Sequence, residues 1–110
     1  MLLLIFVLVL AVPATAAERR STVRLLDEAP VTVLGTGFAS RERVTIRVAP
    51  TSGPAYSKLL RASLTGRFTA TFADRSVPEC AGYTITAVGG AGSRAKIREL
   101  PPPCGYDPAP

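Results

Sequence analysis

From Ser21 onward, apolar and polar residues alternate with a period of two in several short segments of the chain. The clearest segment covers residues 43–48, where Val44, Ile46 and Val48 alternate with arginine or threonine. Successive side chains of a β-strand point to opposite sides, so this pattern is typical of a strand with one buried and one solvated face. No segment after residue 20 shows apolar residues at helical spacing over the length of a helix. The chain is therefore predicted to be all-β.

The same alternation predicts further strands along the chain. Val31 and Val33 begin a strand that ends at the glycines of residues 35–37, and the other clear segments are residues 68–72, 83–88 and 94–98. Residues 21–26 and 56–64 are less regular candidates. Short strands at these intervals favour a sandwich of two sheets with about seven strands.

Glycine, proline and other turn-forming residues separate the predicted strands. Pro50, Gly53 and Pro54 separate one pair, and residues 89–92 are expected to form a hairpin. Thr65-Gly66 predicts a tight hairpin between the two strands that flank it. Asp27-Glu28 is interpreted as a solvated turn that leads into Pro30, since neighbouring carboxylates on a strand point to opposite faces.

Residues 1–17 have the form of a secretory signal peptide. They contain no charged side chain, and the apolar run of residues 2–12 is followed by small residues up to Ala17. Cleavage is expected after Ala16 or Ala17. An uncleaved membrane anchor is the alternative, but Pro13 interrupts the run before the roughly 20 residues that a spanning helix needs. We expect a secreted, extracellular protein with a folded domain at residues 18–100, a proline-rich tail at residues 101–110 and no stable membrane insertion after cleavage.

The chain contains two cysteines, Cys80 and Cys104. An even number of cysteines in an exported chain favours a disulfide bond over free thiols. The alternative is a pair of metal ligands, but the chain has no histidine and no further cysteine to complete a coordination shell. We therefore expect a disulfide, with no metal site and no cofactor.

The composition disfavours enzymes and nucleic-acid-binding proteins. There is no histidine to act as a general base, the acidic residues are scattered, and no glycine-rich phosphate loop precedes a helix. Aromatic residues make up 6% of the chain, and the core is expected to take most of them, so few rings remain to stack on bases. We expect no catalytic residues and no nucleic acid partner.

Four segments resemble, in order and spacing, the immunoglobulin-like domains of exported bacterial proteins. The segments are Val31-Thr32-Val33-Leu34-Gly35-Thr36-Gly37-Phe38, Val44-Thr45-Ile46, Gly66-Arg67-Phe68 and Gly82-Tyr83-Thr84-Ile85-Thr86-Ala87. The resemblance implies an immunoglobulin-like Greek-key sandwich in which Phe38 packs in the core and Tyr83 lies at the entrance to the sixth strand. It also implies that Cys80 and Cys104 lie close together, where the sixth strand starts and the seventh ends.

In that topology the third, sixth and seventh strands are neighbours in one sheet. Their outward positions include Thr84 and Thr86, between two rows of basic residues. The basic residues of the two rows are Arg43, Arg47, Arg94, Lys96 and Arg98. Such a face is a candidate binding site for a polyanion. The alternative is a solvated face whose charges only prevent aggregation.

These features are compatible with two classes of function. The first is a structural, adhesive or binding module of the cell exterior that contacts an acidic envelope polymer or another extracellular protein. The second is a carrier of a small apolar ligand, because the exported apoproteins that hold chromophores are also sandwiches of this size. An apolar cleft would distinguish a carrier from a binding module.

Overall fold

The computed structural model describes residues 20–104, and this part of the chain folds into seven strands without a helix. No membrane-spanning helix therefore occurs between residues 20 and 104. The predicted signal peptide and residues 105–110 of the tail lie outside the described residues. The strands are β1 (Thr22–Glu28), β2 (Val31–Thr36), β3 (Arg43–Pro50), β4 (Tyr56–Arg61), β5 (Phe68–Phe72), β6 (Tyr83–Gly89) and β7 (Arg94–Glu99).

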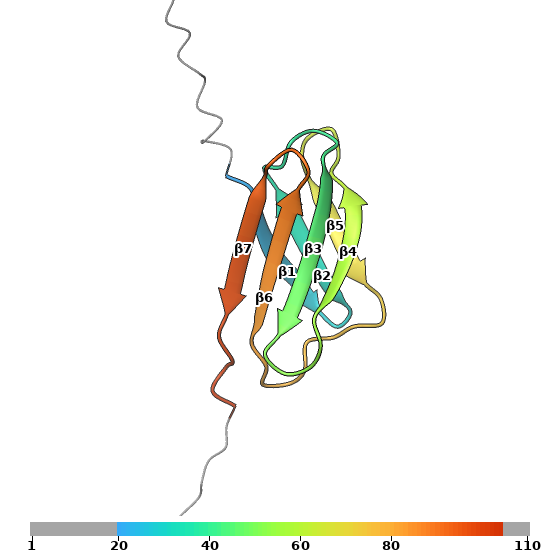
Figure 1. Ribbon diagram of the computed structural model, residues 1–110. Helices are drawn as coiled ribbons and strands as arrows, with labels where there is room; N and C mark the ends of the chain where they lie inside the picture. The colour runs from blue at the N-terminus through green and yellow to red at the C-terminus, as the bar shows by residue number, and fades with distance from the viewer. Residues whose placement is uncertain (1–19, 105–110) are drawn as a thin grey trace, which may run out of the picture.

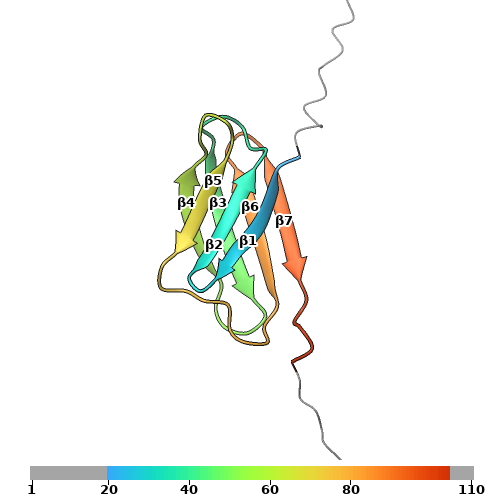
Figure 2. The ribbon, with the colours of Figure 1, turned by 180° about the vertical axis from the view of Figure 1, so that it is seen from behind.

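The strands form two antiparallel sheets that face each other (Figure 1). One sheet has four strands in the order β4-β3-β6-β7, and the other has three in the order β1-β2-β5. Figure 2 shows the three-stranded sheet from its outer side. The prediction of an all-β chain with seven strands in two sheets is therefore confirmed.

The core is the apolar layer between the two sheets. The alternating apolar residues of β2 and β3 are fully buried, as the alternation predicted, and so is Ile85 of β6. In β2 and β3 they are Val31, Val33, Val44, Ile46 and Val48. Aromatic rings close the layer at its ends: Phe38 packs edge-on against Phe68, with 5.1 Å between ring centroids, and Tyr56 packs in the same way against Phe72 at 5.0 Å. Phe38 is 3% exposed, as the resemblance implied.

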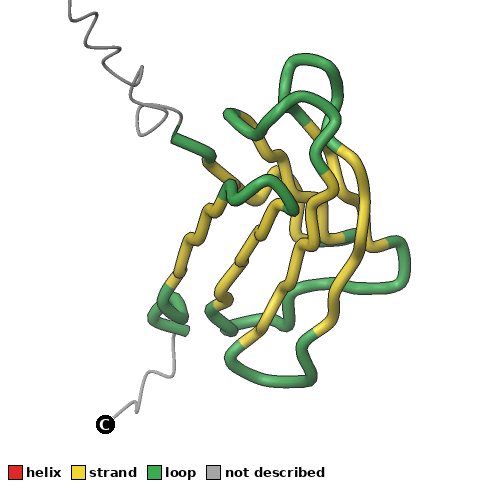
Figure 3. Tube along the Cα trace, turned by 45° about the horizontal axis from the view of Figure 1, so that its top comes forward, coloured by secondary structure: helices red, strands yellow, loops and turns green. Residues whose placement is uncertain are grey.

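Loops gather at the two ends of the sandwich (Figure 3). Residues 62–67 connect β4 to β5, and these strands belong to different sheets. The prediction of a tight hairpin at Thr65-Gly66 is therefore wrong, because β4 pairs with β3 and β5 pairs with β2. Gly66 instead has a positive φ of 76° and lies against the carbonyl of Phe38, where a Cβ would not fit.

The interpretation of Asp27-Glu28 as a turn is also wrong. Both residues belong to β1, where they pair with Thr32 and Val31 of β2. A register shift between Leu25 and Asp27 marks a bulge, which inserts an extra residue and lets pairing continue beyond it. Because of the bulge, Asp27 lies opposite the outward-facing Thr32 and Glu28 lies opposite the buried Val31.

A disulfide joins Cys80 to Cys104, as predicted, with 5.3 Å between their Cα atoms. Cys80 precedes β6 and Cys104 follows β7. The two half-cystines are neighbours because Tyr83, the first residue of β6, pairs with Glu99, the last residue of β7. The bond therefore ties the start of the tail to the loop before β6.

Candidate functional site

The outer surface of the four-stranded sheet carries six basic side chains, which we call the basic face. All six are exposed. They are Arg43 and Arg47 on β3, Arg61 on β4, and Arg94, Lys96 and Arg98 on β7. Five of them were predicted from the sequence, and the structure adds Arg61. Figure 1 shows this sheet from its outer side, and no described segment lies in front of it.

The strand register places these cations in rows across the sheet. Arg47 pairs with Thr86, which pairs with Lys96, so the threonine lies between two cations. Neighbouring strands lie roughly 4.8 Å apart, so Arg47 and Lys96 start from backbones about 10 Å apart. In the next row, Thr84 pairs with Arg98. The structure thus brings the predicted basic residues and threonines onto one surface.

At the opposite end of the same face, Arg43 of β3 pairs directly with Arg61 of β4. Like charges placed opposite each other on a sheet destabilise it. This pair of arginines therefore does not stabilise the sheet, and stability does not account for its position.

No carboxylate of the described residues lies on the basic face. The acids among residues 20–104 occupy other places: Asp27 lies on the other sheet, Glu42 and Asp74 lie in loops, and Glu28, Glu79 and Glu99 line one end of the sandwich. The six cations are consequently not neutralised by acidic neighbours on their own surface.

The outer surface of the three-stranded sheet is different in charge. Its outward positions on β1 include one cation, Arg24, and one anion, Asp27. The remaining polar positions there are threonines: Thr22, Thr32, Thr36, Thr69 and Thr71. The two outer surfaces of the same sandwich therefore differ by six formal charges, +6 against 0, counting the residues named here. A threonine surface is polar without charge, so solubility alone does not require the basic face.

Two exposed apolar side chains lie within the basic face. Leu59 of β4 and Val88 of β6 both pair with Thr45 of β3, so these three residues form one row across the sheet. Leu59 is 64% exposed and Val88 is 41% exposed. The row continues to Arg94 on β7, and the pair of Arg43 and Arg61 forms the adjacent row.

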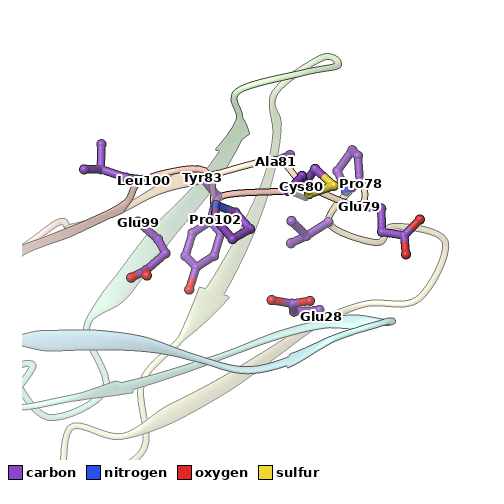
Figure 4. A pocket seen from close by; sticks show the side chains of 11 residues that line it. Glu28, Pro78, Glu79, Cys80, Ala81, Tyr83, Glu99, Leu100 and Pro102 are labelled. Atoms are coloured by element: carbon purple, nitrogen blue, oxygen red, sulfur yellow. A yellow bond between two sulfur atoms is a disulfide. The ribbon is translucent and has the colours of Figure 1, made fainter. Parts of the chain in front are cut away.

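A second feature is a pocket of about 610 Å³ at the end of the sandwich that holds the disulfide (Figure 4). Its wall includes the disulfide, proline and apolar side chains, the ring of Tyr83 and three carboxylates. The carboxylates are those of Glu28, Glu79 and Glu99. We call this feature the end pocket. Within residues 20–104, no group of three or more histidine, cysteine, aspartate or glutamate side chains is arranged to hold a metal ion.

The phenol of Tyr83 points toward the space between Glu28 and Glu99 (Figure 4). Burial raises the pKa of Tyr83, and the negative charges of Glu99 and Glu28 raise it further, because all three disfavour the phenolate. The end pocket is therefore negatively charged and holds a protonated tyrosine at neutral pH.

Glu42 is a buried carboxylate at the opposite end of the sandwich, 5% exposed. Its Oε1 accepts a hydrogen bond from the amide of Ala39 at 3.0 Å, and its Oε2 accepts one from Ala91 at 2.7 Å and one from Ser93 at 3.4 Å. Burial acts to raise the pKa of Glu42, but the hydrogen bonds from Ser93, Ala39 and Ala91 outweigh it and hold the pKa below its ordinary value.

This carboxylate holds the loop before β3 against the hairpin between β6 and β7. Gly89 lies directly beside it, and a Cβ at that position would overlap the carboxyl group. The hydrogen bonds use both oxygens of Glu42, so the charge serves the fold and is not available to a ligand.

No protein-family model matches this chain, and no similar curated protein is found. The chemistry of the site therefore has to be judged from its own residues. Among these, the basic face differs clearly in charge from the outer surface of the other sheet.

Proposed function

We propose that this chain is a secreted, non-enzymatic immunoglobulin-like module that binds an acidic partner of the cell exterior through the basic face. An acidic envelope polymer and an acidic extracellular protein are two partners of this kind. The strand order supports the immunoglobulin-like part of the proposal, because the third, sixth and seventh strands share a sheet as they do in that class of sandwich.

The observation that carries the proposal is the difference between the two outer surfaces. Six cations without a carboxylate lie on the outer surface of the four-stranded sheet, whereas Arg24 and Asp27 balance each other on the outer surface of the other sheet. Charge of one sign on an open surface attracts polyanions, and arginine forms strong hydrogen bonds with phosphate and carboxylate groups. Thr84 and Thr86 add hydroxyl groups between the cations.

The pair of Arg43 and Arg61 supports the same conclusion. Two guanidinium groups on paired residues repel each other in the free protein. An anion bound between them would replace this repulsion with two charge-assisted interactions. The arrangement is thus unfavourable for folding and favourable for binding an anion.

The carrier of a small apolar ligand is less well supported. Ligand sites of that kind are lined mainly by apolar and aromatic groups. The end pocket has three glutamates in its wall. Its chemistry suits a cation or water better than an apolar molecule.

The test is retention on envelope material and on an anionic resin. A variant with Arg43, Arg47, Arg94 and Lys96 changed to glutamate should elute without salt, whereas the wild type should require salt. The matched control changes Arg20, Arg24, Arg41 and Arg67 to glutamate, four exposed cations outside the basic face. Each variant changes the net charge by −8, from +5 to −3, so the two differ only in position. Equal loss of retention in both variants would contradict the proposal.

A further inference from the structure

One row of the basic face carries two apolar side chains. Leu59 and Val88 lie on either side of Thr45 in one row, and both are substantially exposed. They are two of the five large apolar side chains that the described residues expose; the others are Leu26, Leu64 and Leu100. No other pair among the five occupies one row of a sheet.

Cations border this apolar row on both sides. Arg43 and Arg61 form the row on one side, and Arg47 and Lys96 belong to the row on the other. Arg94 extends the apolar row itself, next to Val88. A ligand that covers the face therefore meets apolar groups in one row and positive charge in the rows on either side of it.

A hydrophilic polyanion complements the positive charges but offers no apolar surface that Leu59 and Val88 can contact. An anionic lipid layer matches both, because its head groups carry negative charge and the apolar region begins directly beneath them. Lipid head groups are also mobile in the plane of the layer. They can move beneath cations at any spacing, so the face needs no fixed array of anions to match it.

The shape of the face is compatible with a surface of this kind. Four paired strands at roughly 4.8 Å separation span about 14 Å, and the outward side chains stand on one side of them. The loops lie at the two ends of the sandwich, so the described loops leave the face open (Figures 1 and 3).

We propose that the basic face binds the surface of an anionic lipid layer, with its cations on the head groups and with Leu59 and Val88 inserted between them. This proposal rests on the proposed function, since it names the partner of the same face. Binding of this kind is peripheral and reversible. The sandwich lies on the layer and does not cross it.

The experiment is co-sedimentation of the mature protein with vesicles of phosphatidylglycerol and phosphatidylcholine, compared with vesicles of phosphatidylcholine alone. The wild type should bind the mixed vesicles and not the neutral ones. Changing Arg47 and Lys96 to glutamine should weaken binding by about 30-fold, since each cation near a charged membrane contributes about fivefold. Inorganic polyphosphate in solution serves as the hydrophilic polyanion in a parallel titration.

The decisive variant is Leu59→Ser with Val88→Thr, which removes apolar surface and leaves the charge unchanged. Its binding to the mixed vesicles should fall at least fivefold, and its binding to polyphosphate should not change. The matched control is Leu26→Ser with Leu64→Ser, two leucines that are 48% and 66% exposed and lie away from the face. This control should bind vesicles like the wild type.

The outcomes separate the two proposals. Binding to polyphosphate without binding to mixed vesicles would overturn the lipid proposal and leave the proposed function in place. Vesicle binding that is unchanged in the variant Leu59→Ser with Val88→Thr would also overturn the lipid proposal, because the apolar row would then not contribute to binding. Failure to bind either polyphosphate or vesicles would count against both proposals. Circular dichroism of each variant verifies that the strands are retained.

Discussion

Arg43 on β3 and Arg61 on β4 lie directly opposite each other in the register of the four-stranded sheet. Neither residue has a carboxylate of the described part of the chain beside it on this face. Their repulsion is the clearest sign that the charges of this face are not optimised for stability. Functional surfaces commonly carry such a cost.

The repulsion between the two arginines is measurable. Changing Arg61 to glutamine should raise the free energy of unfolding by about 0.2–1 kcal/mol, because like charges on paired residues destabilise a sheet by that order. The same change in a variant that already has Arg43→Gln should give a smaller gain. Urea unfolding of the four proteins of this double-mutant cycle measures the coupling. Additive effects would show that the two side chains do not interact.

Glu42 should make the stability of the fold depend on pH in acid. Its pKa is lower in the folded protein than in the unfolded chain, so its ionised form stabilises the fold. This contribution is fully present above the unfolded pKa and is lost as the pH falls through the lower folded pKa. At neutral pH, Glu42→Gln should cost about 1–3 kcal/mol, because a buried carboxylate with three amide donors is replaced by a neutral group.

The check is thermal or urea unfolding of the wild type and Glu42→Gln across the acid range. The difference in the free energy of unfolding between the wild type and Glu42→Gln should become smaller as the pH falls. Gly89→Ala serves as a companion variant, since a Cβ there overlaps the Glu42 carboxyl group and should destabilise the same contact. A constant difference at all pH values would contradict the assignment of the effect to ionisation.

The disulfide between Cys80 and Cys104 should contribute substantially to stability. The two residues are 24 positions apart, and closing a loop of that length lowers the entropy of the unfolded chain by an amount worth roughly 3–3.5 kcal/mol. The variant with both cysteines changed to serine should lose stability of this order in urea unfolding. A loss well below 1 kcal/mol would show that the ends of β6 and β7 stay together without the bond.

Tyr83 reports on the charge of the end pocket. Burial and the charges of Glu99 and Glu28 all raise its pKa, so removing one charge should lower it. A site-resolved NMR titration of the tyrosine ring should show a downward shift in Glu99→Gln and a further one when Glu28→Gln is added. Glu42→Gln, at the other end of the sandwich, is the control and should leave the pKa of Tyr83 unchanged. No shift in the double variant would place both carboxylates too far from the phenol.

Alternation located β2, β3 and β5 because their apolar and polar residues alternate with burial. It did not resolve β4, where Lys58 and Leu59 depart from the alternation. Lys58 points inward at the edge of the sandwich, where its Nζ donates a hydrogen bond to the carbonyl of Thr71 at 2.7 Å and lies 5.9 Å from the centroid of the Phe72 ring. Leu59 consequently points outward, so β4 has an exposed lysine on its core-facing side and an exposed leucine on its outer side.

Because the pattern of β4 is poorly defined, the sequence alone does not place Arg61 on the basic face. The end pocket has no sequence signal either, since Glu28, Glu79 and Glu99 come from distant parts of the chain. Glu42 stands between Arg41 and Arg43 and looks like a surface residue in the sequence. Its burial depends on the amides of Ala91 and Ser93, which only the fold brings to it.

The central claim is that the position of the cations on the four-stranded sheet, and not net charge, determines binding to an acidic partner. Two variants of equal net charge test it most directly: Arg47→Gln with Lys96→Gln on the basic face, and Thr69→Glu with Thr71→Glu on the outer surface of the other sheet. Each lowers the net charge by two, from +5 to +3. Titration with inorganic polyphosphate should show a weakening of at least tenfold for the first variant and less than twofold for the second. Equal weakening of the two variants would contradict the claim.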